Sequence, residues 1–232
     1  MIPAIGPDYG KMLDQARILA QTRYRTAMVL QFGGFTTSEG VEAGLTRIAD
    51  TAGMPLTLYV IKSENYVDVD ALARLIDRGT LIAVEYAIVR ANPADDPYLR
   101  RLLRHVPAAR VSGMGERPAL VHLCEFGLAA WTTGSGCIAP RMVMALLQAA
   151  KSGDRETAQR LYDAFQPLET LRDDISLIRV LHDAVTLSKL ADMGPILPLL
   201  SSTPPEHHAK IEHATRALLA LEHEIAQSNP NP

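Results

Sequence analysis

Short apolar segments alternate with longer segments of helical periodicity along roughly the first 140 residues of the chain. The apolar segments lack a regular alternation of polar and apolar positions, which is typical of strands buried on both faces of a sheet. Glycine, proline and polar residues follow most of these segments and mark turns. The pattern predicts six strands, at Met1–Ile5, Ala27–Leu30, Pro55–Ile61, Leu81–Val84, Ala109–Ser112 and Leu128–Trp131.

The segments between these strands predict helices, because apolar side chains recur there at helical spacing. Asp8 and Ser38 stand where they can cap the first two helices. A third helix is expected from about Asp68 to Asp77 and is ended by Gly79. The next two helices are predicted around Pro97–His105 and over the apolar positions Leu120, Val121, Leu123 and Phe126.

No strand pattern remains beyond Pro140, where the sequence predicts three or four helices and a frayed tail at residues 227–232. The breaks between these helices are expected near Gly153, Pro167, Gly194–Pro198 and Pro204–Pro205.

Six strand–helix repeats with short connections favour a parallel sheet with right-handed crossovers. Two architectures satisfy this pattern, an open doubly wound sheet and a barrel. A closed barrel of this kind needs eight strands and typically about 250 residues. The hydrophobic pattern alone does not choose between the two.

Composition narrows the class of protein without naming an activity. Apolar residues make up 47% of the 232 residues, which supports a sizeable core, and a net charge of −3 offers no basic field for nucleic acid. The apolar stretches are too short to cross a membrane, and the first residues do not follow the pattern of a secretory signal. Cys124 and Cys137 form neither a disulfide framework nor a metal motif, so we expect a cytoplasmic protein with reduced thiols.

A set of segments stands out by its order and spacing: Pro55–Tyr59, Leu81–Glu85, Val111–Glu116, Gly127–Pro140, Ser152–Asp154 with Ala158 and Leu161, and Met193–Leu200. Taken together, these segments resemble the dihydrodipicolinate synthase / N-acetylneuraminate lyase family. Glu85 closes the segment that resembles the strand delivering the family's lysine, and it falls 26 residues after Tyr59.

This resemblance implies an α/β fold, a TIM-type (β/α)8 barrel that lacks its first two βα units and carries a C-terminal helical extension. Residues 1–140 would form barrel strands three to eight, and residues 141–226 the last barrel helix and the extension. An N-terminal truncation, a misplaced start and a degenerate paralogue all remain open. The resemblance also implies self-association, as a dimer or tetramer. Unpaired sheet edges would make the isolated chain less soluble than a full barrel, unless a partner or Met1–Ile5 covers them.

The chemistry that the resemblance implies is class I aldol chemistry on pyruvate-type 2-oxo acids, without a cofactor or a metal. A lysine amine forms an imine with the ketone, and a carboxylate cannot do so. Tyr59 matches the family's proton-relaying tyrosine, and Glu85 stands where the lysine is expected. Glu85 is then a paired or solvated anion, or a general base, unless the strand register differs. The family's second tyrosine should lie near Phe32–Phe35, where none stands.

A small polar pocket is expected from the loops that follow the last two strands, since such loops often bind anions in barrels. Its predicted substrate-binding residues are Ser112, Gly113, Gly115, Trp131 and Thr132. Ordinary turn chemistry explains these loops equally well, and Trp131 could equally be a core residue.

Two other candidate groups are weaker. Lys62 is the only other lysine near a predicted strand end, and a loop charge explains it better than a replacement amine. His207, His208 and His213 lie on an exposed, charged helix without an acidic ligand set, which favours a solvated helix face over a metal site.

Three hypotheses follow from these residues. The first is a lyase or aldolase relative that is inactive or altered because the Schiff-base lysine is absent. The second is a non-catalytic barrel subunit that binds a small acid or assembles with intact paralogues. The third is a lyase that works without an imine and uses Glu85 as its base.

Overall fold

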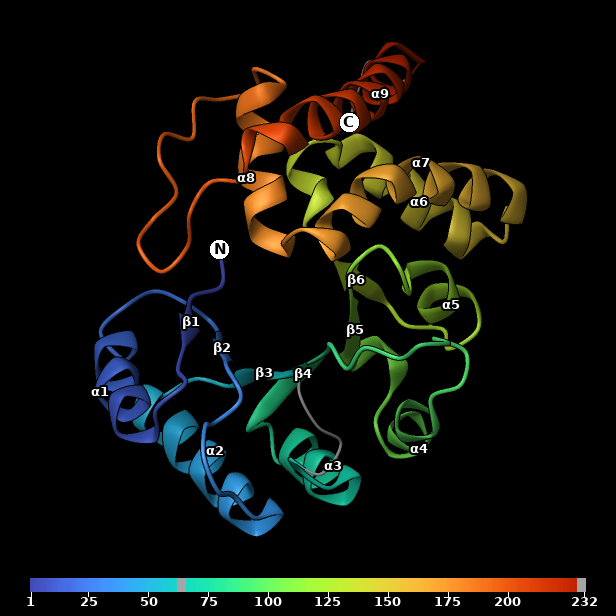
Figure 1. Cartoon of the computed structure of the whole chain (residues 1–232). Coiled ribbons are helices and arrows are strands. Elements are labelled where there is room, and N and C mark those ends of the chain that lie inside the picture. The colour runs from blue at the N-terminus through green and yellow to red at the C-terminus, as the bar shows by residue number, and fades with distance from the viewer. Residues whose placement is uncertain (62–65, 229–232) are drawn as a thin grey trace. The chain divides into compact units, whose positions relative to one another are not determined.

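A six-stranded parallel sheet forms the framework of the protein (Figure 1). The structure is a computed structural model, and it describes residues 1–61 and 66–228. The strands lie in chain order, each paired in parallel with the next. Their bounds are β1 Ala4–Ile5, β2 Ala27–Val29, β3 Leu56–Val60, β4 Leu81–Tyr86, β5 Val111–Met114 and β6 Ala130–Thr132.

The order of strands and helices is that of six consecutive strand–helix units of a TIM-type barrel. Each strand pairs with its sequence neighbour, and β1 and β6 form the two edges of the described sheet. The barrel is therefore not closed among the described residues. The predicted fold class is confirmed, while the open doubly wound alternative requires a strand order that departs from sequence order.

Contacts divide the chain into two compact units. The first comprises residues 1–114 and 125–132 and contains the sheet. The second comprises residues 115–124 together with the chain from residue 133 onward. The predicted domain boundary at residue 140 stays a prediction.

The helices of the first unit cover one face of the sheet (Figure 1). Val29, Leu58, Val84 and Val111 stand side by side in the strand register and are almost completely buried. They share the core with the apolar stripes of the helices, because side chains alternate between the two faces of each strand. The helices are α1 Tyr9–Leu19, α2 Ser38–Ala52, α3 Val69–Asp77 and α4 Pro97–His105.

Side-chain caps begin three of these helices. The Asp8 carboxylate accepts a hydrogen bond from the Lys11 backbone N–H at 3.2 Å, as predicted for α1. The prediction that Ser38 caps α2 is wrong, because Thr37 Oγ1 accepts the bond from the Gly40 N–H at 3.1 Å. Ser38 is the first helical residue, and its hydroxyl accepts from the Asp68 N–H at 2.8 Å.

The last two strands begin later than predicted. Ala108–Arg110 form a 3₁₀ turn after Pro107, so β5 begins at Val111 and extends to Met114. The last strand is Ala130–Thr132 rather than Leu128–Trp131, because the left-handed backbone of Gly127 (φ 69°) turns the chain just before it. This shift brings Thr132 into the sheet.

The second unit is helical. Pro167, a predicted break, lies inside α7 and does not end it. The long buried face of α7, which packs against α6, α8 and α9, offsets the hydrogen bond that proline removes. The helices of this unit are α5 Ala119–Cys124, α6 Pro140–Ser152, α7 Arg155–Asp174, α8 Leu177–Leu187 and α9 His208–Ser228.

The described residues from Pro140 onward thus form four α-helices, within the three or four that the sequence pattern predicts. Glu222 of α9 accepts hydrogen bonds from the backbone N–H groups of Arg141 and Met142 at 3.0 and 2.9 Å. The carboxylate therefore satisfies the N-terminus of α6, where no side-chain cap precedes the helix. No helix among residues 1–61 and 66–228 has the length and apolar character that a membrane span requires.

Candidate functional site

A row of polar side chains occupies the face of the sheet opposite the helices of the first unit. Tyr59 of β3, Glu85 of β4 and Ser112 of β5 are register partners, so their side chains project from the same face. Thr132 of β6 reaches this row by contacting Glu85. The strand register therefore brings together four residues that the sequence predicts as site residues.

Glu85 is the charged member of this row. Its side chain is buried, with 6% of the residue exposed, and Thr132 Oγ1 donates a hydrogen bond to its Oε1 at 2.6 Å. Burial raises the pKa of the Glu85 carboxyl above its usual range, and the bond from Thr132 opposes this rise. The Oε2 atom has no hydrogen-bond partner within the described part of the chain.

Tyr59 lies beside Glu85 and is half-buried. Its hydroxyl donates a hydrogen bond to Met114 Sδ at 2.9 Å. Burial, and then the charge of Glu85, raise the pKa of the Tyr59 phenol. The phenol therefore stays protonated at neutral pH, and its hydroxyl is held toward a sulfur atom.

Ser112 and Gly113 continue the row on β5. The Ser112 hydroxyl donates to the Gly113 carbonyl at 3.1 Å, and Thr132 Oγ1 lies 3.5 Å from the same carbonyl. Trp131 projects from the other face of β6, because it stands between Ala130 and Thr132 in an extended strand. Gly115 belongs to the second unit and has a left-handed backbone, with φ 76°. The predicted binding roles of these residues stay predictions.

The segment that should supply a second tyrosine carries phenylalanine and glycine. The Phe32 ring packs edge-on against Tyr9 and Tyr66, at centroid distances of 5.8 and 6.1 Å. The Phe32 backbone N–H donates to the Tyr66 hydroxyl at 3.0 Å. Phe35 is fully exposed. Lys62, the alternative amine, lies outside the described residues.

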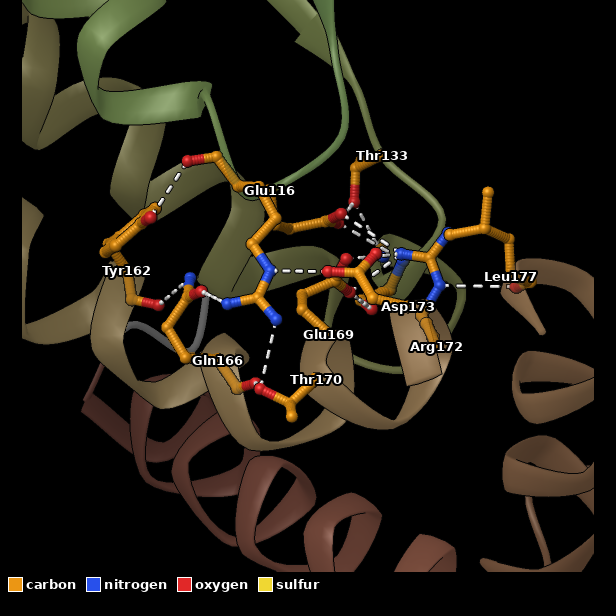
Figure 2. Close-up of polar contacts among 12 residues, drawn as sticks. Glu116, Thr133, Tyr162, Gln166, Glu169, Thr170, Arg172, Asp173 and Leu177 are labelled. Carbon is orange, nitrogen blue, oxygen red and sulfur yellow. Dashed lines mark hydrogen bonds and ion pairs between the residues drawn. The ribbon is translucent and has the colours of Figure 1, made fainter. Parts of the chain in front are cut away.

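The second unit contains a buried charged cluster that the sequence did not predict (Figure 2). Arg172 Nη1 lies 2.7 and 2.8 Å from the two carboxylate oxygens of Glu169 and 3.3 Å from Glu116 Oε2. Ser135 Oγ donates to Glu169 at 2.5 Å, and Thr133 Oγ1 donates to Glu116. The cluster ties the turn at residues 133–137 to α7.

Two carboxylates in this cluster share one guanidinium. Glu116 is completely buried, and Glu169 and Arg172 are 3% and 9% exposed. Burial, and then the charge of Glu169, raise the pKa of Glu116 to about 7. Glu169 and Arg172 stand at i, i+3 on the face of α7 that also buries Phe165 and Leu168. Charged residues on an otherwise apolar helix face were the signal available in the sequence.

Curated relatives match much of the chain. No protein-family model matches it. A 4-hydroxy-tetrahydrodipicolinate synthase of Corynebacterium urealyticum is 26% identical over 170 residues, which are 72% of this chain and 54% of that protein. A synthase of the same name from Gluconacetobacter diazotrophicus is 29% identical over 168 residues, 69% of this chain and 48% of its own length. The chain thus spans about half the length of the curated relatives it matches.

Solved structures of the same enzymes share the fold. Dihydrodipicolinate synthase from Oceanobacillus iheyensis superposes with a TM-score of 0.79 at 18% identity, over 93% of this chain and 72% of that one. This chain is related to the dihydrodipicolinate synthase / N-acetylneuraminate lyase family. The sequence relatives and the structural likeness therefore agree with the resemblance read from the segments.

Two members of the polar row stand at or near the carboxyl ends of their strands. In TIM-type barrels, functional side chains gather at the carboxyl ends of the strands. Glu85 is the fifth of six residues in β4, and Thr132 is the last residue of β6. The row therefore lies at the end of the sheet where TIM-type barrels generally carry functional side chains.

Proposed function

We propose that this chain is a dihydrodipicolinate synthase relative that does not form a Schiff base, because Glu85 replaces the lysine that attacks the 2-oxo acid. The aligned segments support this replacement, since Tyr59 and Glu85 are register neighbours on β3 and β4. A catalytic-lysine mutant of the sialic acid aldolase of Ruminococcus gnavus, a protein of the same fold, has also been solved. Imine formation needs a nitrogen nucleophile, and Glu85 supplies none.

The observation that carries this proposal is the state of Glu85. The Glu85 carboxyl is buried beside the phenol of Tyr59 and accepts a hydrogen bond from Thr132. The hydrogen bond from Thr132 stabilises a carboxylate at this position. The protein therefore holds a carboxylate, rather than a nucleophilic amine, at this strand end. A pyruvate-type 2-oxo acid, if it binds, would bind without covalent attachment.

A second candidate function is a non-catalytic subunit of a homo-oligomer or of a complex with intact paralogues. The open edges of the sheet at β1 and β6 favour it, because unpaired strand edges are usually covered in native proteins. A cytoplasmic dimer or tetramer is the assembly that fits this role. Size-exclusion chromatography with light scattering tests it, and a stable monomer that melts cooperatively would argue against it.

Borohydride trapping with pyruvate, read by intact mass, tests the main proposal. We expect no adduct on the unmodified chain and an adduct on the Glu85→Lys variant. The exposed residue Glu125 supplies the matched control, since Glu125→Lys adds the same amine away from the row. An adduct on the unmodified chain would refute the proposal, and peptide mapping would identify the lysine responsible. Failure of Glu85→Lys to form an adduct would refute the placement of Glu85 at the lysine position.

A further inference from the structure

The hydroxyl groups of the polar row all donate to neighbouring protein atoms. Tyr59 donates to Met114 Sδ at 2.9 Å, Ser112 donates to the Gly113 carbonyl at 3.1 Å, and Thr132 donates to Glu85 at 2.6 Å. A hydroxyl has one proton to donate and two lone pairs to accept with. In this arrangement each of these oxygens turns its lone pairs toward a ligand.

Glu85 adds the strongest acceptor of the row. An ionised carboxylate accepts hydrogen bonds and donates none, and Oε2 is left without a partner within residues 1–61 and 66–228. No lysine or arginine of the described residues forms a hydrogen bond or ion pair with the four side chains of the row. The row is therefore a set of acceptors around one buried negative charge.

From this arrangement we propose that the polar row of Tyr59, Glu85, Ser112 and Thr132 binds a small organic cation with a primary ammonium group. An ammonium group carries three donors and no acceptor, which matches the row in both charge and hydrogen-bond direction. It would donate to Glu85 Oε2 and to the free lone pairs of the hydroxyl oxygens. The inference rests on the proposed function, because it takes Glu85 as a carboxylate that stands in place of the imine-forming lysine.

The same comparison of donors and acceptors disfavours binding of a 2-oxo acid to the polar row. Such a ligand presents carboxylate and ketone oxygens, which are acceptors, to a face that offers acceptors. Its negative charge would also approach a buried carboxylate without a compensating cation among the described residues. Protonation of Glu85 would supply one donor, so binding of an acid should improve at low pH, whereas binding of an ammonium group should weaken.

Ligand-observed NMR distinguishes these cases with probes of matched size: propylammonium, propionate, pyruvate and 1-propanol. We expect saturable binding of propylammonium to the full chain at neutral pH, and binding of the other three that is at least roughly tenfold weaker. Glu85→Gln keeps the shape of the side chain and removes its charge, and it should weaken propylammonium binding roughly tenfold or more. The control Glu125→Gln, a change of the same charge at an exposed position, should leave it unchanged.

A measurement on the unmodified chain covers the case in which Glu85→Gln fails to fold. Affinity for propylammonium should fall as the pH is lowered through the raised pKa of Glu85, while circular dichroism reports an intact fold. Absence of propylammonium binding, equal binding by Glu85→Gln, or tighter binding of pyruvate at neutral pH would each overturn the inference. The two proposals separate cleanly: an adduct on Glu85→Lys together with no ammonium binding would leave the proposed function standing and remove only the ligand class.

Discussion

Glu116 provides the sharpest test of the electrostatics in this protein, and Glu116→Gln is the perturbation. The Glu116 side chain is completely buried and lies beside Glu169 and Arg172 of α7. Its charge also contributes to raising the pKa of the Cys137 thiol. The substitution keeps a similar shape and an oxygen for the bonds from Thr133 and the Ser135 N–H. It removes the ionisable group at position 116 and leaves Glu169 and Arg172 as an ion pair without a second carboxylate beside it.

The size of the expected change in the free energy of unfolding follows from the raised pKa of Glu116. A rise in the pKa of Glu116 from 4.5 to about 7 corresponds to about 3 kcal/mol, at about 1.4 kcal/mol per pKa unit. Because the folded pKa is raised, the folded protein retains a proton that the unfolded chain has lost. The stability contributed by this proton is fully present below pH 4.5 and is lost as the pH rises to about 7.

Urea unfolding followed by far-ultraviolet circular dichroism, at several values from about pH 4.5 to about pH 8, measures the effect. The free energy of unfolding of the unmodified chain should fall by about 3 kcal/mol more across this window than that of Glu116→Gln. Glu206→Gln, at an exposed position of the same unit, is the control and should keep the slope of the unmodified chain. Equal slopes for the unmodified chain and Glu116→Gln would refute the reasoning.

Two further substitutions test packing and capping in the second unit. Gly134→Ala should destabilise the protein by about 1–3 kcal/mol, because an added Cβ would lie 2.5 Å from Arg172 Nη2 and 2.7 Å from Leu181 Cδ1. Gly10→Ala, whose Cβ would meet nothing closer than 3.5 Å, is its control, and equal melting temperatures for the two variants would contradict the prediction. Glu222→Ala should cost about 1–3 kcal/mol in urea unfolding, since one buried and one partly buried N–H group at the start of α6 lose their acceptor. A stability equal to that of Glu206→Ala would contradict this prediction.

The fold could be predicted because its signals are local and repeated. Each strand carries an apolar run, and each helix carries an apolar stripe at helical spacing. The prediction of six strand–helix repeats therefore does not depend on any single element. The errors in the predicted elements lie where a single residue determines the beginning or end of a helix. Thr37 rather than Ser38 caps α2, and Pro167 stays inside α7 because tertiary packing outweighs a lost hydrogen bond.

The candidate site could be predicted only in part. Tyr59 and Glu85 were found because the order of segments resembles a family, and the register then places them side by side. The cluster around Glu116 was missed because its members are distant in sequence, with Glu116, Ser135 and Arg172 coming from separate segments. No spacing rule links Glu116, which follows a strand, to Arg172 on a helix 56 residues later, so only the folded chain reveals the shared guanidinium.

The contacts around Glu85 are those of an accommodated carboxylate. Thr132 turns its proton toward Glu85, and Tyr59 turns its own toward Met114, so neither competes with the other for the carboxylate. A lysine at the same place would carry donors, and the hydroxyl of Thr132 would then have to accept rather than donate. The hydrogen bonds of the row are thus consistent with an anion at position 85. Glu85→Lys must reorient Thr132 before it can restore an amine, so its trapping rate should rise further when Thr132 is changed to valine, which removes the competing donor without altering the size of the side chain. A trapping rate that falls in Glu85→Lys/Thr132→Val would mean that the row is built around a nitrogen, and that Glu85 is an isolated replacement in a site that otherwise still fits a lysine.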